Sequence, residues 1–244
     1  MNPPISSTRI GTFERIPAGL LLYLVVFSIG LFVIACSDDQ PVVEGDDAAG
    51  LLPGALLSPA DMPGGNWTVT EDDPFAFNAS LASIPACGAL ASLLTRVDDE
   101  ATARARTRLW ANPGPVVQIE LAAFSTADVA DGLIADRRAL SGEEIVECSG
   151  QTAKRGLRDL SARVIPSTPS AAAPHDGVAY ADDRDIAGPQ GARTNIHSET
   201  YVWRQGSVYV RVDLLALGGV DLTDLATRVL KQVSDAASAI LGSE

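Results

Sequence analysis

The chain has 244 residues and carries 18 lysine and arginine against 31 aspartate and glutamate side chains, which gives a formal net charge of −13 at pH 7. This charge argues against nucleic acid and anionic lipid as ligands, because both are bound by basic protein surfaces. The length suits one folded domain behind an N-terminal targeting segment rather than two domains.

An uncharged apolar run covers residues 17–35, with Arg9 and Arg15 before it and an acidic stretch after it. Its length suits a signal-peptide core or a membrane-spanning helix, and its charge asymmetry places the rest of the chain outside the cytoplasm. The cysteine that follows it, Cys36, resembles the lipidated cysteine of a bacterial lipobox. We therefore expect residues 1–35 to be a lipoprotein signal peptide or, alternatively, an uncleaved signal anchor. The domain is then held at the cell membrane, on its extracytoplasmic side.

The segment after the apolar run has little to bury. Residues 36–50 consist largely of Asp, Glu, Gly and Ala, which predicts a flexible acidic tether behind the lipidated cysteine. Residues 51–244 predict a single extracytoplasmic domain. The domain opens with apolar residues mixed with proline and glycine turns, which lead into a short strand at residues 67–70.

A helix follows from residue 83, with Pro85 in its first turn and apolar residues at helical spacing up to Val97. Strands over residues 101–110 and 116–124 then predict a hairpin. Alternation in its first strand places three arginines on one face: Arg104, Arg106 and Arg108. Such a face could clamp an anionic group, or the arginines could pair with carboxylates of the same chain.

The remaining elements end in a clear hairpin and a clear helix. The pattern predicts a helix over residues 125–140 capped by Ser125, a short segment at 145–148, a strand over 157–165, a proline-rich exposed loop over 166–174, a possible strand at 178–180 and a charged loop over 181–193. Residues 196–204 and 207–217 predict a hairpin joined at Gln205-Gly206. Asp221 caps a last helix that carries an apolar stripe to Leu241.

This order of elements predicts an α+β domain, an antiparallel sheet with helices packed mainly on one face. In the second strand of the last hairpin, the side chains alternate between an apolar and a polar face. The apolar face comprises Val208, Val210, Val212 and Leu214, and the polar face comprises Tyr209, Arg211 and Asp213.

Two cysteines remain once Cys36 is assigned to the lipid. An extracytoplasmic location favours a disulfide between Cys87 and Cys148. A closed loop of about 60 residues gives roughly 4 kcal/mol of stabilisation in the chain-entropy model. Two buried free thiols are the alternative, and a zinc site is less favoured because the short ligand spacings of such sites do not occur.

Several features occur together along the chain. These are the lipobox, the acidic tether, the sequence LSPADMPGGNW at 57–67, one cysteine in the first helix and one after the second, and the sequence VWRQGSVYV at 202–210. In this combination the chain resembles the extracellular sensor domain of the mycobacterial kinase PknH and its lipoprotein relatives. The resemblance covers about residues 51–241 and implies a sheet and helices around a cleft for an unidentified ligand. That sensor domain has two disulfides where this chain can form one, and no kinase motif occurs here.

The candidate binding residues are aromatic and basic. Three tryptophans, which more often pack in a core, are candidates to line an apolar pocket, beside the three arginines above: Trp67, Trp110 and Trp203. We assign no catalytic residue, because His175 and His197 lie outside any recognisable nucleophile motif. We expect no cofactor and no metal site, since the acidic stretch at 182–185 lacks the spacing of a calcium loop.

Three functions fit these observations. We expect a non-catalytic envelope lipoprotein with a sensor-like domain that binds a small apolar or amphipathic ligand, for which a preformed cavity is required. The alternative is an interaction module for an envelope protein, which requires an exposed apolar patch. A hydrolase is less favoured and requires a nucleophile within reach of His175 or His197.

Overall fold

The computed structural model of the chain describes residues 49–64, 66–70, 81–156, 161–187, 193–217 and 219–241. All of them belong to one compact unit. The predicted signal peptide, the predicted lipidation site Cys36 and nearly all of the predicted tether lie outside the described residues. Within the described part of the chain, no helix has the length and apolar character needed to cross a membrane.

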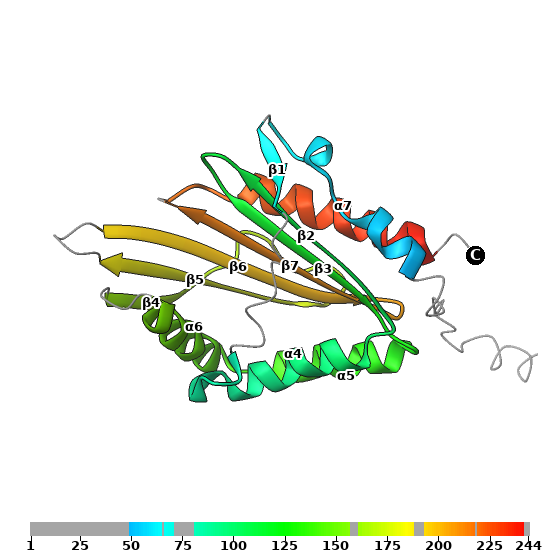
Figure 1. The fold of residues 1–244 in the computed structure, drawn as a ribbon, viewed down its shortest axis with the longest axis horizontal. Coiled ribbons are helices and arrows are strands. Elements are labelled where there is room, and N and C mark those ends of the chain that lie inside the picture. The colour runs from blue at the N-terminus through cyan, green and yellow to red at the C-terminus, as the bar shows by residue number, and fades with distance from the viewer. Residues whose placement is uncertain are drawn as a thin grey trace, which may run out of the picture. The chain divides into compact units, whose positions relative to one another are not determined.

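The described strands form one seven-stranded antiparallel sheet, in the order β1-β2-β3-β7-β6-β5-β4 (Figure 1). Both predicted hairpins are confirmed, since β2 pairs with β3 and β6 pairs with β7. The strands are β1 (Trp67–Val69), β2 (Ala103–Ala111), β3 (Val116–Ala123), β4 (Ser161–Ser167), β5 (Val178–Ala187), β6 (Arg193–Gln205) and β7 (Val208–Leu217).

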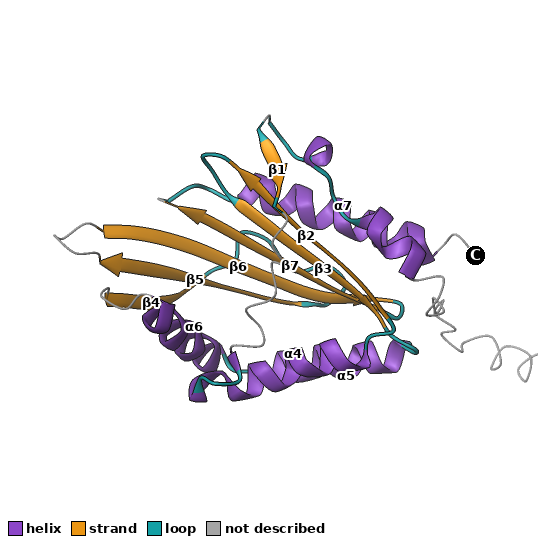
Figure 2. Cartoon of the chain, viewed as in Figure 1, coloured by secondary structure: helices purple, strands orange, loops and turns teal. Residues whose placement is uncertain are grey.

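Helices cover both faces of this sheet, with three of the four long helices on one face (Figure 2). The described helices are the 3-10 turns η1 (Leu52–Ala55), η2 (Pro59–Asp61) and η3 (Pro85–Cys87), and the α-helices α4 (Gly88–Glu100), α5 (Ala127–Ala139), α6 (Gly142–Gly156) and α7 (Thr223–Leu241). Helices α4, α5 and α6 form one layer, and among the described α-helices only α7 lies on the opposite face, where η1 packs against it. The predicted fold class is therefore confirmed.

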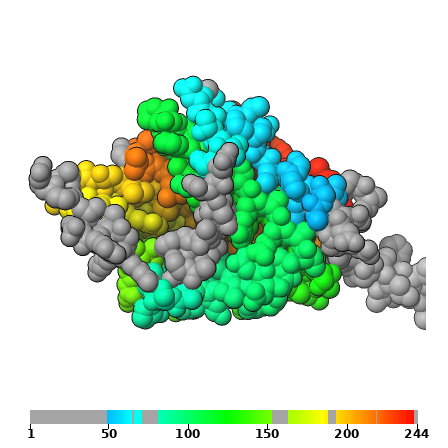
Figure 3. Space-filling model, viewed as in Figure 1, coloured from blue at the N-terminus to red at the C-terminus, as the bar shows by residue number. Residues whose placement is uncertain are grey.

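The larger core lies between the sheet and α7. Side chains of β7 that alternate toward α7, among them Val210 and Val212, are fully buried against Val229 and Val233 of the helix. The lead-in segment closes the edge of this core, because Leu52 of η1 is fully buried within it. In the space-filling view the lead-in, coloured blue to cyan, lies beside the red C-terminal helix (Figure 3).

The disulfide between Cys87 and Cys148 is present, with 4.7 Å between the two Cα atoms. It joins η3, at the start of α4, to the middle of α6. Both cysteines are buried in a small apolar cluster of their own, with Leu81, Ile84 and Leu94. The bridge therefore holds α4 and α6 together, which are the two helices of the three-helix layer that lie farthest apart in the sequence.

Three predictions of local structure are wrong. The short segment predicted at 145–148 is part of α6, because Glu143 and Glu144 open a helix whose apolar side holds Ile145 and Cys148. The charged loop predicted at 181–193 is strand β5 as far as Ala187, since Asp182 and Arg184 pair with each other on the sheet. Strand β4 also extends to Ser167, so the proline-rich stretch starts inside an edge strand.

The predicted helix caps agree only in part. Asp221 accepts a hydrogen bond from the amide of Thr223 at the start of α7, 2.9 Å away, which lowers the pKa of its carboxyl. The cap of α5 is Thr126 rather than Ser125, because the Thr126 hydroxyl accepts from the amide of Val129.

Candidate functional site

The face of the sheet beneath α4, α5 and α6 carries polar side chains where a core would be apolar. Strand register places these side chains in rows that run from β2 across to β5. The rows are Arg106, Glu120 and Arg211; Arg108, Gln118, Asp213, Thr200 and Tyr180; and Trp110, Val116, Leu215, Ser198 and Asp182. The three helices therefore cover a surface that is polar along these rows, while Phe124, Val202 and Tyr209 beside the rows pack on α4 and α5 in an apolar cluster.

Two adjacent cavities lie along these rows, and we call them together the cleft. The inner cavity has a volume of 280 Å³ and lies between the polar rows and an apolar wall, to which Leu90 and Leu94 of α4 contribute beside Cys148. The outer cavity has a volume of 420 Å³ and is lined mainly by apolar side chains near the ends of β2, β6 and β7. Leu215 borders both cavities.

The outer cavity exposes apolar surface. Trp110 is 40% exposed and Leu217 is 56% exposed. Arg108 and Thr70 supply its polar groups, and the Arg108 Nε has no hydrogen-bond partner among the described residues. An apolar body with one acidic group would match this lining.

Buried ion pairs organise the inner end of the cleft. Arg106 Nε donates to Glu120 Oε1 at 2.8 Å, and its Nη2 lies 2.8 Å from Asp98 Oδ1. Arg211 Nη2 lies 2.8 Å from Asp213 Oδ2, and the Thr200 hydroxyl donates to the other oxygen of Asp213 at 2.6 Å. Burial opposes the charged form of Arg211, but Asp213 and the neighbouring charges outweigh it and raise the pKa of the guanidinium.

A second set of contacts lies on β5. Arg184 Nε donates to Asp182 Oδ1 at 2.6 Å, and the Ser149 hydroxyl of α6 donates to Asp182 Oδ2 at 3.3 Å. Arg137 of α5 is only 3% exposed and stacks 4.9 Å from the centre of the Tyr180 ring. Its Nε and Nη1 have no hydrogen-bond partner among the described residues.

This network has an excess of positive charge although the chain as a whole is acidic. Its cations are Arg104, Arg106, Arg108, Arg137, Arg184 and Arg211, and its anions are Asp98, Glu120, Asp182 and Asp213. A buried guanidinium that has unused donors favours a bound anion, because burial without hydrogen bonds is costly. The cleft is therefore suited to an amphipathic ligand with an anionic group.

The predicted arginines share one face of β2 as expected, but they differ in their partners. Arg104 and Arg106 both pair with Asp98, and Arg106 also pairs with Glu120. Arg108 borders the outer cavity.

The structure does not bring the three tryptophans together. Trp203 is fully buried and Trp67 is 9% exposed, both in the core beneath α7. Only Trp110 lies on the cleft side of the sheet.

Sequence reasoning missed Arg211, Asp213 and Thr200 as site residues. A signal was present, because Arg211 and Asp213 are charged residues within an apolar strand. The residues that they face on β3 and β5, Glu120 and Tyr180, come from distant parts of the chain, so the pattern alone did not show that the polar face is enclosed.

The two histidines lie away from the cleft. The ring of His197 lies between Asp183 Oδ1 at 2.8 Å and Glu199 Oε1 at 2.9 Å. His175 Nε2 lies 2.9 Å from the hydroxyl of Ser234, so one histidine does have a nucleophile within reach. Ser234 lies in the interior of α7, however, where backbone amides are already bonded within the helix and do not form an oxyanion hole.

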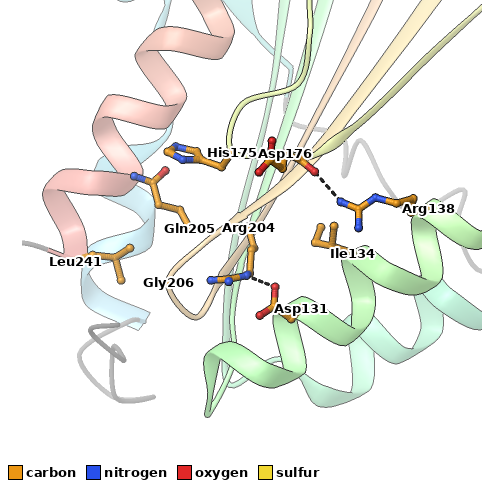
Figure 4. A pocket seen from close by; sticks show the side chains of 9 residues that line it. All are labelled: Asp131, Ile134, Arg138, His175, Asp176, Arg204, Gln205, Gly206 and Leu241. Carbon is orange, nitrogen blue, oxygen red and sulfur yellow. Dashed lines mark hydrogen bonds and ion pairs between the residues drawn. The ribbon is translucent and has the colours of Figure 1, made fainter. Parts of the chain in front are cut away.

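His175 also borders a cavity of 640 Å³, which is shown in Figure 4. This cavity lies at the other end of the sheet, between α5, the turn after β6 and the end of α7. Among the described residues, no group of three or more His, Cys, Asp or Glu side chains is arranged to hold a metal ion.

Comparison with known proteins finds similarity of fold. The crystal structure of the extracellular domain of PknH from Mycobacterium tuberculosis matches with a TM-score of 0.45 and 15% identity, over 80% of this chain and 98% of that chain. The crystal structure of LpqN, involved in cell envelope biogenesis of Mycobacterium tuberculosis, matches with a TM-score of 0.26 and 12% identity, over 73% of this chain and 76% of that chain. No protein-family model and no curated protein matches the sequence.

Proposed function

We propose that this protein is a non-catalytic, lipid-anchored protein of the cell envelope whose cleft binds a small amphipathic ligand with an anionic group. The observation that carries the proposal is the lining of the cleft. An apolar outer cavity with Trp110 and Leu217 leads to an inner cavity whose network has more arginines than carboxylates. The apolar part of the ligand packs at the outer end, and its anionic group contacts Arg108 or Arg211.

The anchor is supported by the sequence features before the domain. The apolar run that ends at Cys36 and the acidic stretch behind it match a lipoprotein export signal. The disulfide requires an oxidising compartment, which agrees with a location outside the cytoplasm. Intact-mass measurement of the membrane-extracted protein checks the anchor, because acyl chains on Cys36 add mass that Cys36→Ser removes.

Ligand binding is tested on the full-length protein in nanodiscs, first by native mass spectrometry. A co-purified small molecule that is released on denaturation supports the proposal and identifies the ligand. Calorimetric titration with 2-naphthalenesulfonate, an aromatic anion, then probes the cleft against empty nanodiscs. Saturable binding that weakens about tenfold in Arg108→Gln is expected, because a charge-assisted hydrogen bond is lost.

Two variants make the titration specific. Trp110→Ala removes apolar contact area from the outer cavity and also weakens binding of 2-naphthalenesulfonate. Arg228→Gln, at an exposed position of α7 on the opposite face of the sheet, leaves it unchanged. Equal binding by the Arg108→Gln, Trp110→Ala and Arg228→Gln proteins would contradict the assignment of the cleft.

A second candidate function rests on exposed apolar side chains at the same end of the sheet. Val69, Trp110, Leu217 and Val220 are each at least 40% exposed, and such patches often bind protein partners. If the patch is a protein interface, crosslinking in intact cells through a photoreactive residue at Val69 captures one envelope protein, and 2-naphthalenesulfonate does not compete with it.

A further inference from the structure

The 640 Å³ cavity at the opposite end of the sheet is separate from the cleft. Helix α5 contributes one stripe of its surface, Asp131, Ile134 and Arg138, which recur at helical spacing. Strand β6 and its turn contribute Arg204 and Gly206. Figure 4 shows these side chains around an open space whose apolar surface comes from Ile134 and from Leu241 of α7.

The rim of this cavity is held in a strained conformation. His175 and Asp176 both have positive φ angles, of 50° and 55°, which residues other than glycine rarely adopt. Gly177 allows the close approach that follows, because a Cβ at this position would lie 2.3 Å from the Val202 carbonyl oxygen. Strained backbone that the surrounding structure maintains is typical of ligand-binding sites.

Side-chain contacts hold that strained turn in place. Arg138 Nη2 donates to the Asp176 carbonyl oxygen at 2.6 Å, and the His175 ring contacts Ser234 of α7 at 2.9 Å. The turn is therefore connected to both helices that border the cavity. The backbone of Asp176 and the side chain of His175 are therefore held at the opening.

The charges around the cavity are mixed in sign. Arg204 pairs with Asp131, so these two side chains largely neutralise each other. Among the described residues, Arg138 has no carboxylate partner and the Asp176 carboxylate has no cationic partner. The opening therefore presents one cation and one anion, which favours a ligand that carries both charges over a simple anion.

The cavity lies at the end of the domain where the chain enters from the predicted tether. Turn η1, close behind the first described residues, packs against α7, and Figure 4 shows it behind Leu241. A chain from Cys36 to Ala49 cannot extend beyond about 45 Å. A domain anchored through Cys36 therefore stays within reach of lipid headgroups, and this step rests on the anchor proposed above.

We propose that this cavity binds a phosphodiester joined to a primary ammonium group, the headgroup chemistry of a zwitterionic phospholipid. Arg138 donates to the phosphate oxygens, and Asp176 accepts from the ammonium group. Ile134 and Leu241 contact the methylene groups between the two charges. Bound in this way, the headgroup orients the domain on the bilayer that carries its anchor.

The test uses the full-length protein in a maltoside detergent, with methyl groups labelled for NMR. Titration with glycerophosphoethanolamine is expected to shift the Ile134 methyl resonances and to saturate. Glycerophosphate has only the anionic group and ethanolamine only the cationic group. Each is expected to bind at least about tenfold more weakly than glycerophosphoethanolamine, because one charge-assisted contact is missing. Equal affinity for glycerophosphate, or no saturable shift, would overturn the proposal.

Two variants separate the contacts. Asp176→Asn keeps the strained turn, because asparagine tolerates a positive φ, and is expected to lose the preference for the zwitterion over glycerophosphate. Arg138→Gln is expected to weaken both ligands. Exposed Asp99 and Arg228 provide the matched controls Asp99→Asn and Arg228→Gln, which leave the titration unchanged. Retention of the preference in Asp176→Asn would contradict the assigned role of that carboxylate.

Nanodiscs distinguish a lipid headgroup from a soluble ligand. In nanodiscs of phosphatidylethanolamine the Ile134 resonances are expected at their ligand-bound position, and in nanodiscs of phosphatidylcholine at the free position, because a quaternary ammonium has no N–H to donate. Identical spectra in the two lipids would overturn the membrane assignment. If Cys36 carries no acyl chains, the proposed anchor is overturned. The titration in detergent does not depend on the anchor and still tests headgroup binding in the cavity.

Discussion

His197 and Glu199 form a hydrogen-bonded polar cluster on the α7 side of the sheet. Both ring nitrogens of His197 face carboxylate oxygens, Asp183 on β5 and Glu199 on its own strand, so both bonds form only when the imidazole is protonated. Glu199 is fully buried and also accepts from Tyr201 and from the backbone of Ser170. Burial opposes the charge of each group, but the bonds to Glu199 and Asp183 raise the pKa of His197. The bonds from Ser170, Tyr201 and His197 lower the pKa of Glu199.

His197 is predicted to make the stability of the protein dependent on pH. Because its pKa is raised in the folded state, its contribution is fully present below the unfolded value of 6.5 and is lost as the pH rises through the folded value. The free energy of unfolding in urea should therefore fall over that range. His197→Gln is expected to flatten this dependence.

The other histidine provides the control for this measurement, because the chain has only two. His175→Asn keeps a residue that tolerates the positive φ at that position and should retain the pH dependence. A wild-type protein with constant stability across this range would show that folding does not raise the pKa of His197.

Helix α7 is the element whose behaviour follows most directly from its sequence. Its apolar positions recur at helical spacing, and each is buried against the sheet, including Leu225, Val229 and Leu230. On its face of the sheet α7 is the one described α-helix, and the short turn η1 packs against it. The larger core of the domain depends on this single packing surface.

Leu230→Ala is predicted to lower the free energy of unfolding by about 2 to 5 kcal/mol, because it leaves a cavity beneath a side chain that is 3% exposed. Urea unfolding followed by circular dichroism measures the change. Arg228→Ala, two positions away and exposed, should change stability by less than about 0.5 kcal/mol. Similar losses in both variants would mean that α7 is held by something other than this stripe.

The whole molecule is a sheet with a tightly packed face and a hollow face. On the α7 side the apolar strand positions meet one α-helix directly, whereas on the other side polar rows and cavities lie beside the apolar cluster that α4 and α5 form with the sheet. The disulfide connects the two parts of that helical layer that border the inner cavity. It therefore affects both the stability of the fold and the shape of the cleft.

Loss of the disulfide is predicted to destabilise the protein and to weaken binding in the cleft. A bridge with a sequence separation of 61 residues contributes up to about 4 kcal/mol in the chain-entropy model. Replacing both Cys87 and Cys148 by alanine should lower the free energy of unfolding by about 2 to 4 kcal/mol and reduce the affinity for 2-naphthalenesulfonate.

Reductant provides the control for the disulfide. It should destabilise the wild-type protein to a similar extent and leave the double variant unchanged. A reductant effect that persists in the double variant would contradict the assignment, because no disulfide between Cys87 and Cys148 then remains to be reduced.

The sequence by itself determined the elements whose signals are local. Such signals are the alternation of residues 207–217, the alternation of the β2 arginines, the apolar stripe of α7 and the count of three cysteines. Each can be interpreted without knowing which residues lie nearby in the fold, because it depends on the period of one element or on the cellular compartment. These features predicted both hairpins, the last helix, the fold class and the pairing of Cys87 with Cys148.

Only the tertiary structure decided which polar residues are enclosed and which charged segments are strands. Asp182 and Arg184 lie in a strand because β6 and α6 supply hydrogen-bond partners, which polar groups need when they are removed from water. Those partners are distant in sequence. The same reason explains why Arg211 lies in the cleft and Trp203 in the core. The alternation along a strand shows which side chains share a face, but long-range packing decides which element covers that face.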